Sequence, residues 1–414
     1  MAQRPRGVSH RVLEAVTGPF SLGVEYMKFW TGYGLSGVAD NVGATALSII
    51  LLQKTGSAVA VSLGLMLQLL PAAMVGPFAG LMLDRLNRKA VMAVASALKA
   101  LATAYVALSI QQGAFGLVQC AVWMGVTSII KAFYDPCSGT LLPSVVSRES
   151  LQRANAMQAL ANNTAMILGP ALAGFGLATA GRAFTMTACA LSFACGSISL
   201  AMVNPKYEAP VRQPGKPGFG EILEGLRFFR EVPLAMHLLV AIVLVNFLAV
   251  PSYTAFEVHV LGTLGADPDA LGYAFSVSAV ASLVAAYLVA LRKRWPHLGR
   301  MMMTGAAAMG ASFVLTGISR SVTGVVWAFA LFGAAGPLLL IPVGALFQEI
   351  TPTGIRGRVF ASRFVVVTLA APLTTPLAGW GLDRLGSRPV LLLLGSLMGL
   401  IAVLGLSSKV IRDA

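Results

Sequence analysis

The chain has 414 residues, of which 57% are hydrophobic and only 11% are Asp, Glu, Lys or Arg. Soluble domains carry about 25% charged residues, so this composition excludes a water-soluble enzyme, a coiled coil and a disordered chain. The formal net charge is +14, but the basic residues stand in short runs between apolar stretches, which indicates membrane topology and excludes a nucleic-acid partner.

A basic N-terminal segment comes first, and it is too polar to be a cleavable signal peptide. Apolar stretches then follow, each long enough for a helix to cross a bilayer, which needs about 20 residues. The stretches are 28–52, 57–83, 90–111, 113–136, 155–180, 182–203, 233–260, 269–291, 300–319, 322–347, 360–382 and 389–408. Their continuity indicates helices and not a β-barrel. The predicted fold class is therefore an all-α integral membrane protein with twelve transmembrane helices.

The longest polar segment, residues 204–231, separates the sixth stretch from the seventh. It contains four prolines and then the sequence GEILEGLRFFREV, which predicts a flexible linker followed by an amphipathic helix on the membrane surface. We therefore expect a six-helix bundle over 1–203, a cytoplasmic linker with its helix over 204–231, and a second six-helix bundle over 232–414.

The distribution of Lys and Arg predicts the orientation. An even number of spans places both termini on one side of the membrane. Most of the 30 Lys and Arg residues then fall on that same side, and basic loops favour the cytoplasm. We expect a multi-pass protein of the plasma (inner) membrane with both termini in the cytoplasm.

Two segments, each at the C-terminal end of a predicted helix, have similar sequences. Residues 77–86 read PFAGLMLDRL and residues 376–385 read PLAGWGLDRL, and residues 170–174 (PALAG) are a shorter relative. The first segment ends at a predicted cytoplasmic loop and the second at a predicted external loop. Such recurrence in oppositely oriented helices favours the inverted repeats that many transporters contain.

The segment GPFAGLMLDRLNRK (76–89) resembles the helix 2–3 signature of the major facilitator superfamily, G-x-x-x-D-R-x-G-R-K/R. The residues that match are Gly80, Asp84, Arg85, Arg88 and Lys89. Asn87 replaces the usual glycine of the turn. The resemblance implies the major facilitator fold of two six-helix bundles, and it implies that these residues form a latch at the cytoplasmic gate.

Two further segments are similar to the macrolide-efflux and enterobactin-exporter branch of that superfamily. They are LLPSVVSRESLQRANAMQALANNTAMILGPALAG (141–174) and TPTGIRGRVFASRF (351–364). Two departures stand beside this resemblance. The loop 288–299 keeps its basic residues without an acidic partner, and Lys131 occupies the fourth span where many drug exporters carry an arginine. The branch implies export of amphipathic small molecules such as drugs or siderophores.

Charged residues inside predicted spans are functional candidates, because each is unfavourable by roughly 2.5–3.5 kcal/mol at the bilayer centre. Asp40 lies in the middle of the first span among small residues. It is expected either to couple protons or substrate to transport, with proton uptake and release preferred, or to be a structural carboxylate that is hydrogen-bonded or paired with a lysine. Lys99 either pairs with an acid such as Asp40 or extends toward an interface. Lys131 and Asp135 are one helical turn apart, so they can pair on one face, either as a substrate or proton-gated pair or as an interfacial one.

Polar uncharged side chains within the spans are candidates for the substrate cavity, or else form hydrogen bonds between helices. These residues are Tyr33, Asn41, Gln68, Asn162, Asn163, Asn246 and Tyr253. We expect Glu257, His259 and Glu349 to lie at the membrane interfaces.

Together these features predict a monomeric secondary transporter, a proton-coupled antiporter that exports small molecules by alternating access. The sequence lacks nucleotide-binding, nucleophile and metal-ligand motifs, so we expect no enzyme activity, cofactor or metal site. Three alternatives remain open: a lipid or lysolipid flippase, a transporter of nutrients, metals or metal chelates, and a non-transporting sensor or assembly factor.

Overall fold

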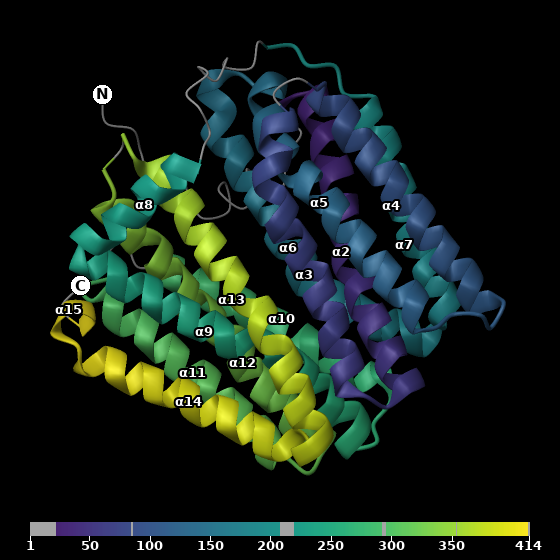
Figure 1. The fold of residues 1–414 in the computed structure, drawn as a ribbon, viewed down its shortest axis with the longest axis vertical. Helices are drawn as coiled ribbons and strands as arrows, with labels where there is room; N and C mark the ends of the chain where they lie inside the picture. The colour runs from purple at the N-terminus through teal and green to yellow at the C-terminus, as the bar shows by residue number, and fades with distance from the viewer. Residues whose placement is uncertain (1–21, 84–85, 208–218, 292–294, 353, 413–414) are drawn as a thin grey trace.

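The computed structural model describes residues 22–83, 86–207, 219–291, 295–352 and 354–412, and all regular secondary structure in these residues is helical. The N half contains α2 (Val24–Thr55), α3 (Ala58–Leu83), α4 (Arg88–Gln111), α5 (Leu117–Val145), η2 (Arg148–Ser150), α6 (Leu151–Thr179) and α7 (Arg182–Ala201). The C half contains α8 (Phe219–Glu231), α9 (Pro233–Glu257), η3 (Val258–Thr263), α10 (Pro268–Leu291), α11 (Leu298–Ile318), α12 (Val322–Ile350), α13 (Arg356–Leu385), α14 (Ser387–Ser407) and α15 (Lys409–Arg412). The two halves form two bundles that diverge toward α8 (Figure 1).

Eleven of the described helices are long and apolar enough to cross a membrane, which supports eleven of the predicted spans. The predicted fifth span, α6, is 29 residues long but is not among them. Amide side chains lower its hydropathy: Gln152, Asn155, Gln158, Asn162 and Asn163. It nevertheless packs along α2 in the N half and α10 in the C half.

The amphipathic helix expected near the end of the polar segment is α8. It buries Phe228 and Phe229 and exposes Arg227 and Arg230, as the pattern GEILEGLRFFREV predicts. An ion pair joins α8 to the start of α13, in which the Arg358 Nη1 atom is 2.7 Å from both carboxylate oxygens of Glu224. We call the end of the molecule that carries α8 the α8 end, and the opposite end the far end.

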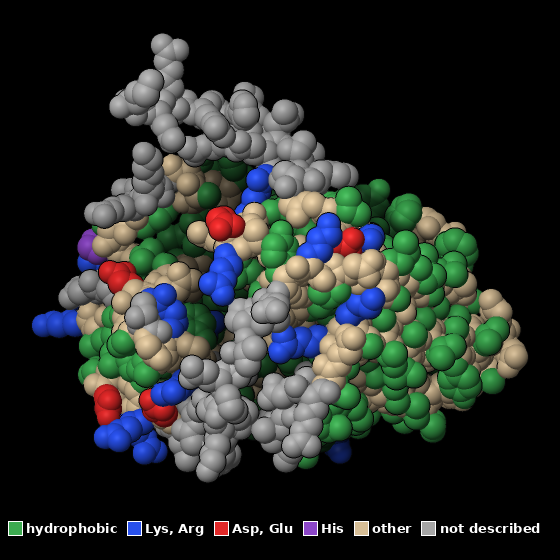
Figure 2. Space-filling model, turned by 90° about the horizontal axis from the view of Figure 1, so that it is seen from above, with side chains coloured by type: hydrophobic (Ala, Val, Ile, Leu, Met, Phe, Trp, Pro, Cys, Tyr) green, Lys and Arg blue, Asp and Glu red, His purple; other side chains and the backbone are tan. Residues whose placement is uncertain are grey.

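The surface has an apolar flank and a charged end. Large apolar side chains on the flank are exposed, including Leu101, Phe184 and Leu400, and a soluble monomer rarely exposes so extensive an apolar surface. Figure 2 looks onto the α8 end, where Lys and Arg side chains gather above a predominantly hydrophobic flank. This arrangement fits a protein whose flank contacts lipid.

Two pairs of helices carry the main packing between the halves, α3 with α13 and α6 with α10. Since α3 and α6 are the N-half helices that contact the C half, the surface between them, formed by α2 and α5, is turned toward the C half. By the same argument, α9 and α12 form the opposing surface. These four helices therefore border the central space between the bundles.

The packing of α6 on α10 depends on two glycines near the far end. A Cβ atom at Gly174 would lie 2.6 Å from the backbone nitrogen of Gly272 and 2.8 Å from the carbonyl oxygen of Pro268. Backbone atoms cannot move aside as a flexible side chain can, so both helices need a residue without a side chain here. Gly174 belongs to the segment PALAG, so the close approach gives that short repeat a packing role.

We expect Gly174→Val to separate the far ends of the two halves. Its branched side chain would push α10 away from α6, so cross-linking between cysteines introduced at Thr179 and Asp267 should fall several-fold relative to the parent protein. Gly125→Val is the matched control, because a Cβ atom at Gly125 meets nothing within 4 Å. Equal cross-linking in the two variants would contradict the prediction.

Candidate functional site

A buried ion pair lies between α2 and α4. The Lys99 Nζ atom is 2.9 Å from Asp40 Oδ1 and 2.7 Å from Asp40 Oδ2, so the ammonium group donates to both carboxylate oxygens. Both residues lie near the middle of their helices, roughly 15–25 Å from either helix end at 1.5 Å per residue. Of the two arrangements left open for Lys99, the structure has the pairing with Asp40.

Aromatic rings complete the surroundings of Lys99. Its Nζ atom is 5.1 Å from the centroid of the Tyr134 ring on α5 and 5.6 Å from that of Phe193 on α7. A cation over a ring face is stabilised by the ring quadrupole, by about 2 kcal/mol when the cation is desolvated. The two rings therefore help α2, α4, α5 and α7 to hold a positive charge away from water.

The two members of the pair differ in their contact with water. The Lys99 side chain is 0% exposed, whereas 17% of the Asp40 side chain is exposed. Water can therefore reach the Asp40 carboxylate but not the Lys99 ammonium group. Protonation of Asp40 would leave Lys99 buried without its counter-charge, which is strongly unfavourable, so the charge state of Asp40 is linked to the packing of four helices.

Stacked aromatic side chains extend from this pair along α2. The Tyr33 ring stacks on Tyr134 at a centroid distance of 6.3 Å and on Phe29 at 6.0 Å. The Tyr134 hydroxyl is buried and makes no hydrogen bond among the described residues. Tyr134 and Phe193 were not predicted from the sequence, because an aromatic residue in an apolar helix gives no signal that distinguishes a cation partner from ordinary packing.

Lys131 and Asp135 lie on α5 within electrostatic range of Asp40. Both side chains are exposed, and no ion pair between them occurs among the described residues. Lys131 is at the middle of α5 rather than at its end. The two groups are therefore not within ion-pair distance, but each lies within electrostatic range of the other.

The predicted gate motif is only partly described. Gly80 lies in α3, while Asp84 and Arg85 lie outside the described residues, so the predicted latch has no structural description. Arg88 begins α4, and its Nη1 atom is 3.4 Å from the carbonyl oxygen of Thr140. Lys89 is half-buried in the first turn of α4.

The predicted cavity residues occupy different environments. Asn41 and Asn246 each donate to a carbonyl one turn earlier in their own helix, Gly37 and Ile242 respectively. Asn162 and Asn163 are exposed on α6, and Gln68 is half-buried on α3. The sequence could not separate these cases. An amide that donates a hydrogen bond to a carbonyl of its own helix and an amide that is exposed look the same in the sequence.

Tyr253 on α9 belongs to an aromatic cluster in the C half. Its ring stacks on Phe275 at 6.3 Å and meets Phe332 edge-on at 5.8 Å. Phe256 and Phe329 continue the cluster. Phe256, Phe275 and Phe329 are buried, so Tyr253 and Phe332 are the partly exposed rings of this cluster.

Glu257 and His259 are buried in the protein near the far end, where α9 ends and η3 begins, and their position at a membrane interface stays a prediction. Ser48 on α2 donates to Glu257 Oε2 at 2.5 Å across the two halves. His259 lies in the π-helix η3, with its Nδ1 atom 2.9 Å from the Ser387 hydroxyl. Helical pattern alone could not reveal these partners, because they come from α2 and α14.

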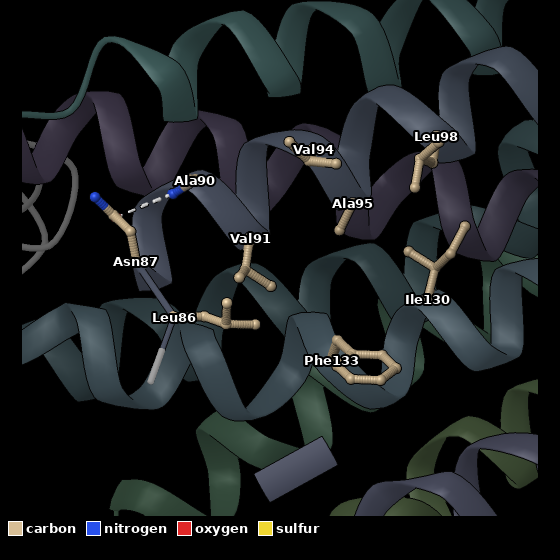
Figure 3. Close-up of a pocket in the computed structure, with 9 residues that line it drawn as sticks. All are labelled: Leu86, Asn87, Ala90, Val91, Val94, Ala95, Leu98, Ile130 and Phe133. Carbon is tan, nitrogen blue, oxygen red and sulfur yellow. Dashed lines mark hydrogen bonds between the residues drawn. The ribbon is translucent and has the colours of Figure 1, made fainter. Parts of the chain in front are cut away.

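A separate pocket of about 510 Å³ lies between α4 and α5 (Figure 3). Its lining is apolar except for Asn87, whose side chain accepts a hydrogen bond from the backbone N–H of Ala90. Val94 and Leu98 are exposed at its wall. Since Lys99 points away from Leu98 into the bundle, this pocket is a groove on the outer flank, distinct from the Asp40–Lys99 site.

Among the described residues, no three His, Cys, Asp or Glu side chains are grouped closely enough to hold a metal ion. The four cysteines have free thiols, and three of them are buried.

Comparison with known proteins agrees with this architecture. Residues 29–373 match the family model of the Major Facilitator Superfamily. The uncharacterized MFS-type transporter YfiS of Bacillus subtilis is 28% identical over 386 residues, covering 89% of each chain. Macrolide efflux protein A of Streptococcus pyogenes is 25% identical and covers 92% of this chain and 95% of its own. The multidrug efflux pump Tap of Mycolicibacterium fortuitum is 26% identical, over 89% and 92% respectively.

Solved structures share the fold. The nucleoside transporter NupG superposes with a TM-score of 0.71 at 12% identity, covering 92% of this chain and 98% of its own. The D-xylose-proton symporter gives a TM-score of 0.72 at 14% identity, covering 93% and 98%. The resemblance found in the signature segment is thus confirmed over most of the chain. The chain belongs to the Major Facilitator Superfamily, and it is a membrane transporter and not an enzyme.

Proposed function

We propose that this transporter is a proton-coupled exporter of amphipathic small molecules, such as drugs or siderophores, and that it works by alternating access. The observation that carries the proposal is the Asp40–Lys99 pair, in which only the carboxylate is partly open to water. A charged pair at mid-bilayer depth is costly to keep, so it is expected to serve transport. Two relatives are described as efflux proteins, for macrolides and for multiple drugs.

The topology that we propose has twelve spans, with α6 as the fifth. Its polar side chains would lie between the bundles rather than in lipid, which is how a span can be poor in apolar residues. The α8 end, where Lys and Arg gather, would face the cytoplasm with both termini. The proposed units are the bundles 1–203 and 232–414, joined by the linker 204–231, in the plasma (inner) membrane of a monomeric protein.

The contacts between the halves indicate which side is open. Ser48 with Glu257, and the close approach of Gly174 to Gly272, both lie near the far end, and the bundles diverge toward α8 (Figure 1). With the α8 end in the cytoplasm, this is an inward-facing arrangement. Exposed polar groups on α5 and α6 then face water that is continuous with the cytoplasm.

Proton coupling would follow from the unequal partners of the pair. A proton arriving at Asp40 neutralises the carboxylate and leaves the Lys99 charge with its aromatic neighbours alone. A conformation that supplies Lys99 with another partner is then favoured. A ligand or proton shifts the equilibrium between two conformations only when it binds one of them more tightly. Loss of the proton restores the pair and the state seen here.

The opposed surfaces are suited to an amphipathic substrate. The aromatic cluster around Tyr253 supplies apolar area, and Lys131, Asp135, Asn162 and Asn163 supply charge and hydrogen bonding. Tyr33, Asn41, Gln68 and Asn246 complete the proposed cavity. The motif residues Gly80, Asp84, Arg85, Arg88 and Lys89 would act at the cytoplasmic gate, as the family signature implies.

Reconstituted transport is the test of this function. Purified protein in proteoliposomes would be given an imposed pH gradient, with a fluorescent amphipathic dye in one sample and a fluorescent lysolipid in another, and protein-free liposomes as the control. The proposal expects dye movement that depends on the gradient. Lysolipid movement without dye movement would indicate a flippase instead of an exporter. Dye movement that does not depend on the pH gradient would contradict proton coupling.

Asp135→Asn should change selectivity without changing the fold. The side chain is exposed and has no ion-pair partner among the described residues, so we expect the free energy of unfolding to change by less than about 0.5 kcal/mol. Uptake of a cationic dye should fall about three- to tenfold, because the local negative potential is lost. Lys131→Gln is the matched variant and should disfavour an anionic dye instead. Equal effects on both dyes would contradict a role in charge selection.

A further inference from the structure

The second copy of the repeated segment makes a contact between the halves. Asp383, near the C-terminal end of α13, binds the first turn of α3 at the far end. Ser57 Oγ donates to Asp383 Oδ2 at 2.8 Å, and the backbone N–H groups of Ala58 and Val59 donate to Oδ1 at 2.6 Å and Oδ2 at 3.2 Å. One carboxylate of the C half thus accepts three hydrogen bonds from the N half.

The backbone donors on α3 are N–H groups of its first turn. The first N–H groups of an α-helix have no partner within the helix. Ser57 already provides a local cap, because its hydroxyl oxygen accepts from the N–H of Ala60 at 3.3 Å. The fold of α3 therefore does not need Asp383, and what Asp383 adds is a connection between the two halves.

The backbones of α3 and α13 approach closely beside this contact. A Cβ atom at Gly379 would lie 2.5 Å from Ser62 Oγ and 2.9 Å from the carbonyl oxygen of Ala58. Gly379 and Asp383 are one helical turn apart on α13, so they share a face. The hydrogen bonds to Asp383 can form only while that face lies against α3, that is, while the far end is closed.

We propose that Asp383 is a positioning residue for the transport cycle and acts as a latch that holds the far end closed. Its hydrogen bonds exist in the state seen here and are lost when the halves separate at this end, so they stabilise one state of the equilibrium over the other. The charge of the carboxylate at a helix N-terminus strengthens the contact. The segments 77–86 and 376–385 both end in Leu-Asp-Arg-Leu, and they begin in the C-terminal parts of α3 and α13, two helices that pack together between the halves.

Distances between spin labels measure this equilibrium directly. Labels would be placed on the full chain in lipid nanodiscs, after replacement of its native cysteines by alanine. Gln112 and Arg320, both exposed, report on the far end, and Glu149 and Lys409, also exposed, report on the α8 end. Pulsed electron paramagnetic resonance would give the distance distribution of each pair for wild type and variant.

Asp383→Ala should raise the ratio of far-end-open to far-end-closed molecules about fivefold, with a matching shortening at the α8 end. Asp269→Ala is the matched control, because Asp269 also accepts from a helix N–H at the same end, that of Ala270, but within the C half alone. It should leave both distributions unchanged. Identical distributions for wild type and Asp383→Ala would overturn the latch.

A second variant keeps the test informative if Asp383→Ala does not fold. Asp383→Asn preserves the shape and one acceptor oxygen but removes the charge, so it should give a smaller shift in the same direction. An Asp383→Asn distribution that matches wild type, together with an unfolded Asp383→Ala, would also overturn the proposal, because the residue would then serve folding alone. The distances are measured without substrate or a pH gradient, so they are independent of proton coupling and of the exporter assignment.

Discussion

Asp40→Asn should abolish the dependence of transport on the pH gradient. Asparagine has nearly the same shape as aspartate and can still accept a hydrogen bond from Lys99, but it cannot bind or release a proton. We expect gradient-driven dye export to fall at least about tenfold, which corresponds to about 1.4 kcal/mol of lost coupling at room temperature. The measurement is dye movement in proteoliposomes at several imposed gradients, with wild type beside the variant.

The control for this experiment separates coupling from binding. Asp135→Asn removes a nearby carboxylate that has no lysine within ion-pair distance among the described residues, so it should retain the response to the gradient even where dye affinity changes. Dye equilibration without a gradient should persist in Asp40→Asn, because the bundles and the aromatic cluster are intact. Gradient-driven export at the wild-type level in Asp40→Asn would remove Asp40 from the mechanism while leaving the transporter in place.

Lys99→Met should destabilise the protein strongly. Methionine fills a similar volume but leaves the Asp40 carboxylate without its partner at mid-bilayer depth. Breaking a buried ion pair by removing one member costs about 3–5 kcal/mol, and the 17% exposure of Asp40 places the expected loss near the lower figure. Thermal unfolding of the purified protein in detergent would measure the loss as a lower midpoint.

The double variant Asp40→Asn/Lys99→Met makes the reason for that loss testable. Removing both charges leaves neither group uncompensated, so most of the stability should return although transport coupling stays absent. The difference between the single and double variants then measures the interaction of the pair. If the double variant is as unstable as Lys99→Met alone, the loss comes from packing around the lysine stem and not from the unpaired carboxylate.

Much of the architecture follows from composition and periodicity. Long apolar stretches must form helices in a bilayer, since every backbone N–H and C=O group has to be satisfied within the segment. The position of α8 followed from two features of the sequence: the prolines of the linker, and the amphipathic pattern of apolar and charged residues in GEILEGLRFFREV after them. Asp40 was identifiable because a lone carboxylate in an apolar helix is expensive, and the signature at 76–89 indicated the family before any geometry was known.

The partners of these residues were decided by the tertiary structure. Lys99 and Asp40 are 59 positions apart, and helical periodicity shows which face a residue occupies but not which helix that face meets. For the same reason the rings of Tyr134 and Phe193 over Lys99, and the Ser48 hydroxyl on Glu257, had no sequence signal. Lys131 and Asp135 had the spacing of an ion pair, yet their side chains stay beyond ion-pair distance and interact only at longer range.

For the repeated Leu-Asp-Arg-Leu, too, the sequence determined one part and the tertiary structure another. The sequence by itself determined that two similar segments stand at the C-terminal ends of two predicted helices of opposite direction, because the limits of the apolar stretches show where each helix stops. Only the packing of α13 on α3 decided that Asp383 meets the unsatisfied N–H groups of another helix. Apolar content and charge are properties of a segment and can be read along the chain, whereas a hydrogen bond between two bundles depends on how whole helices are placed in space.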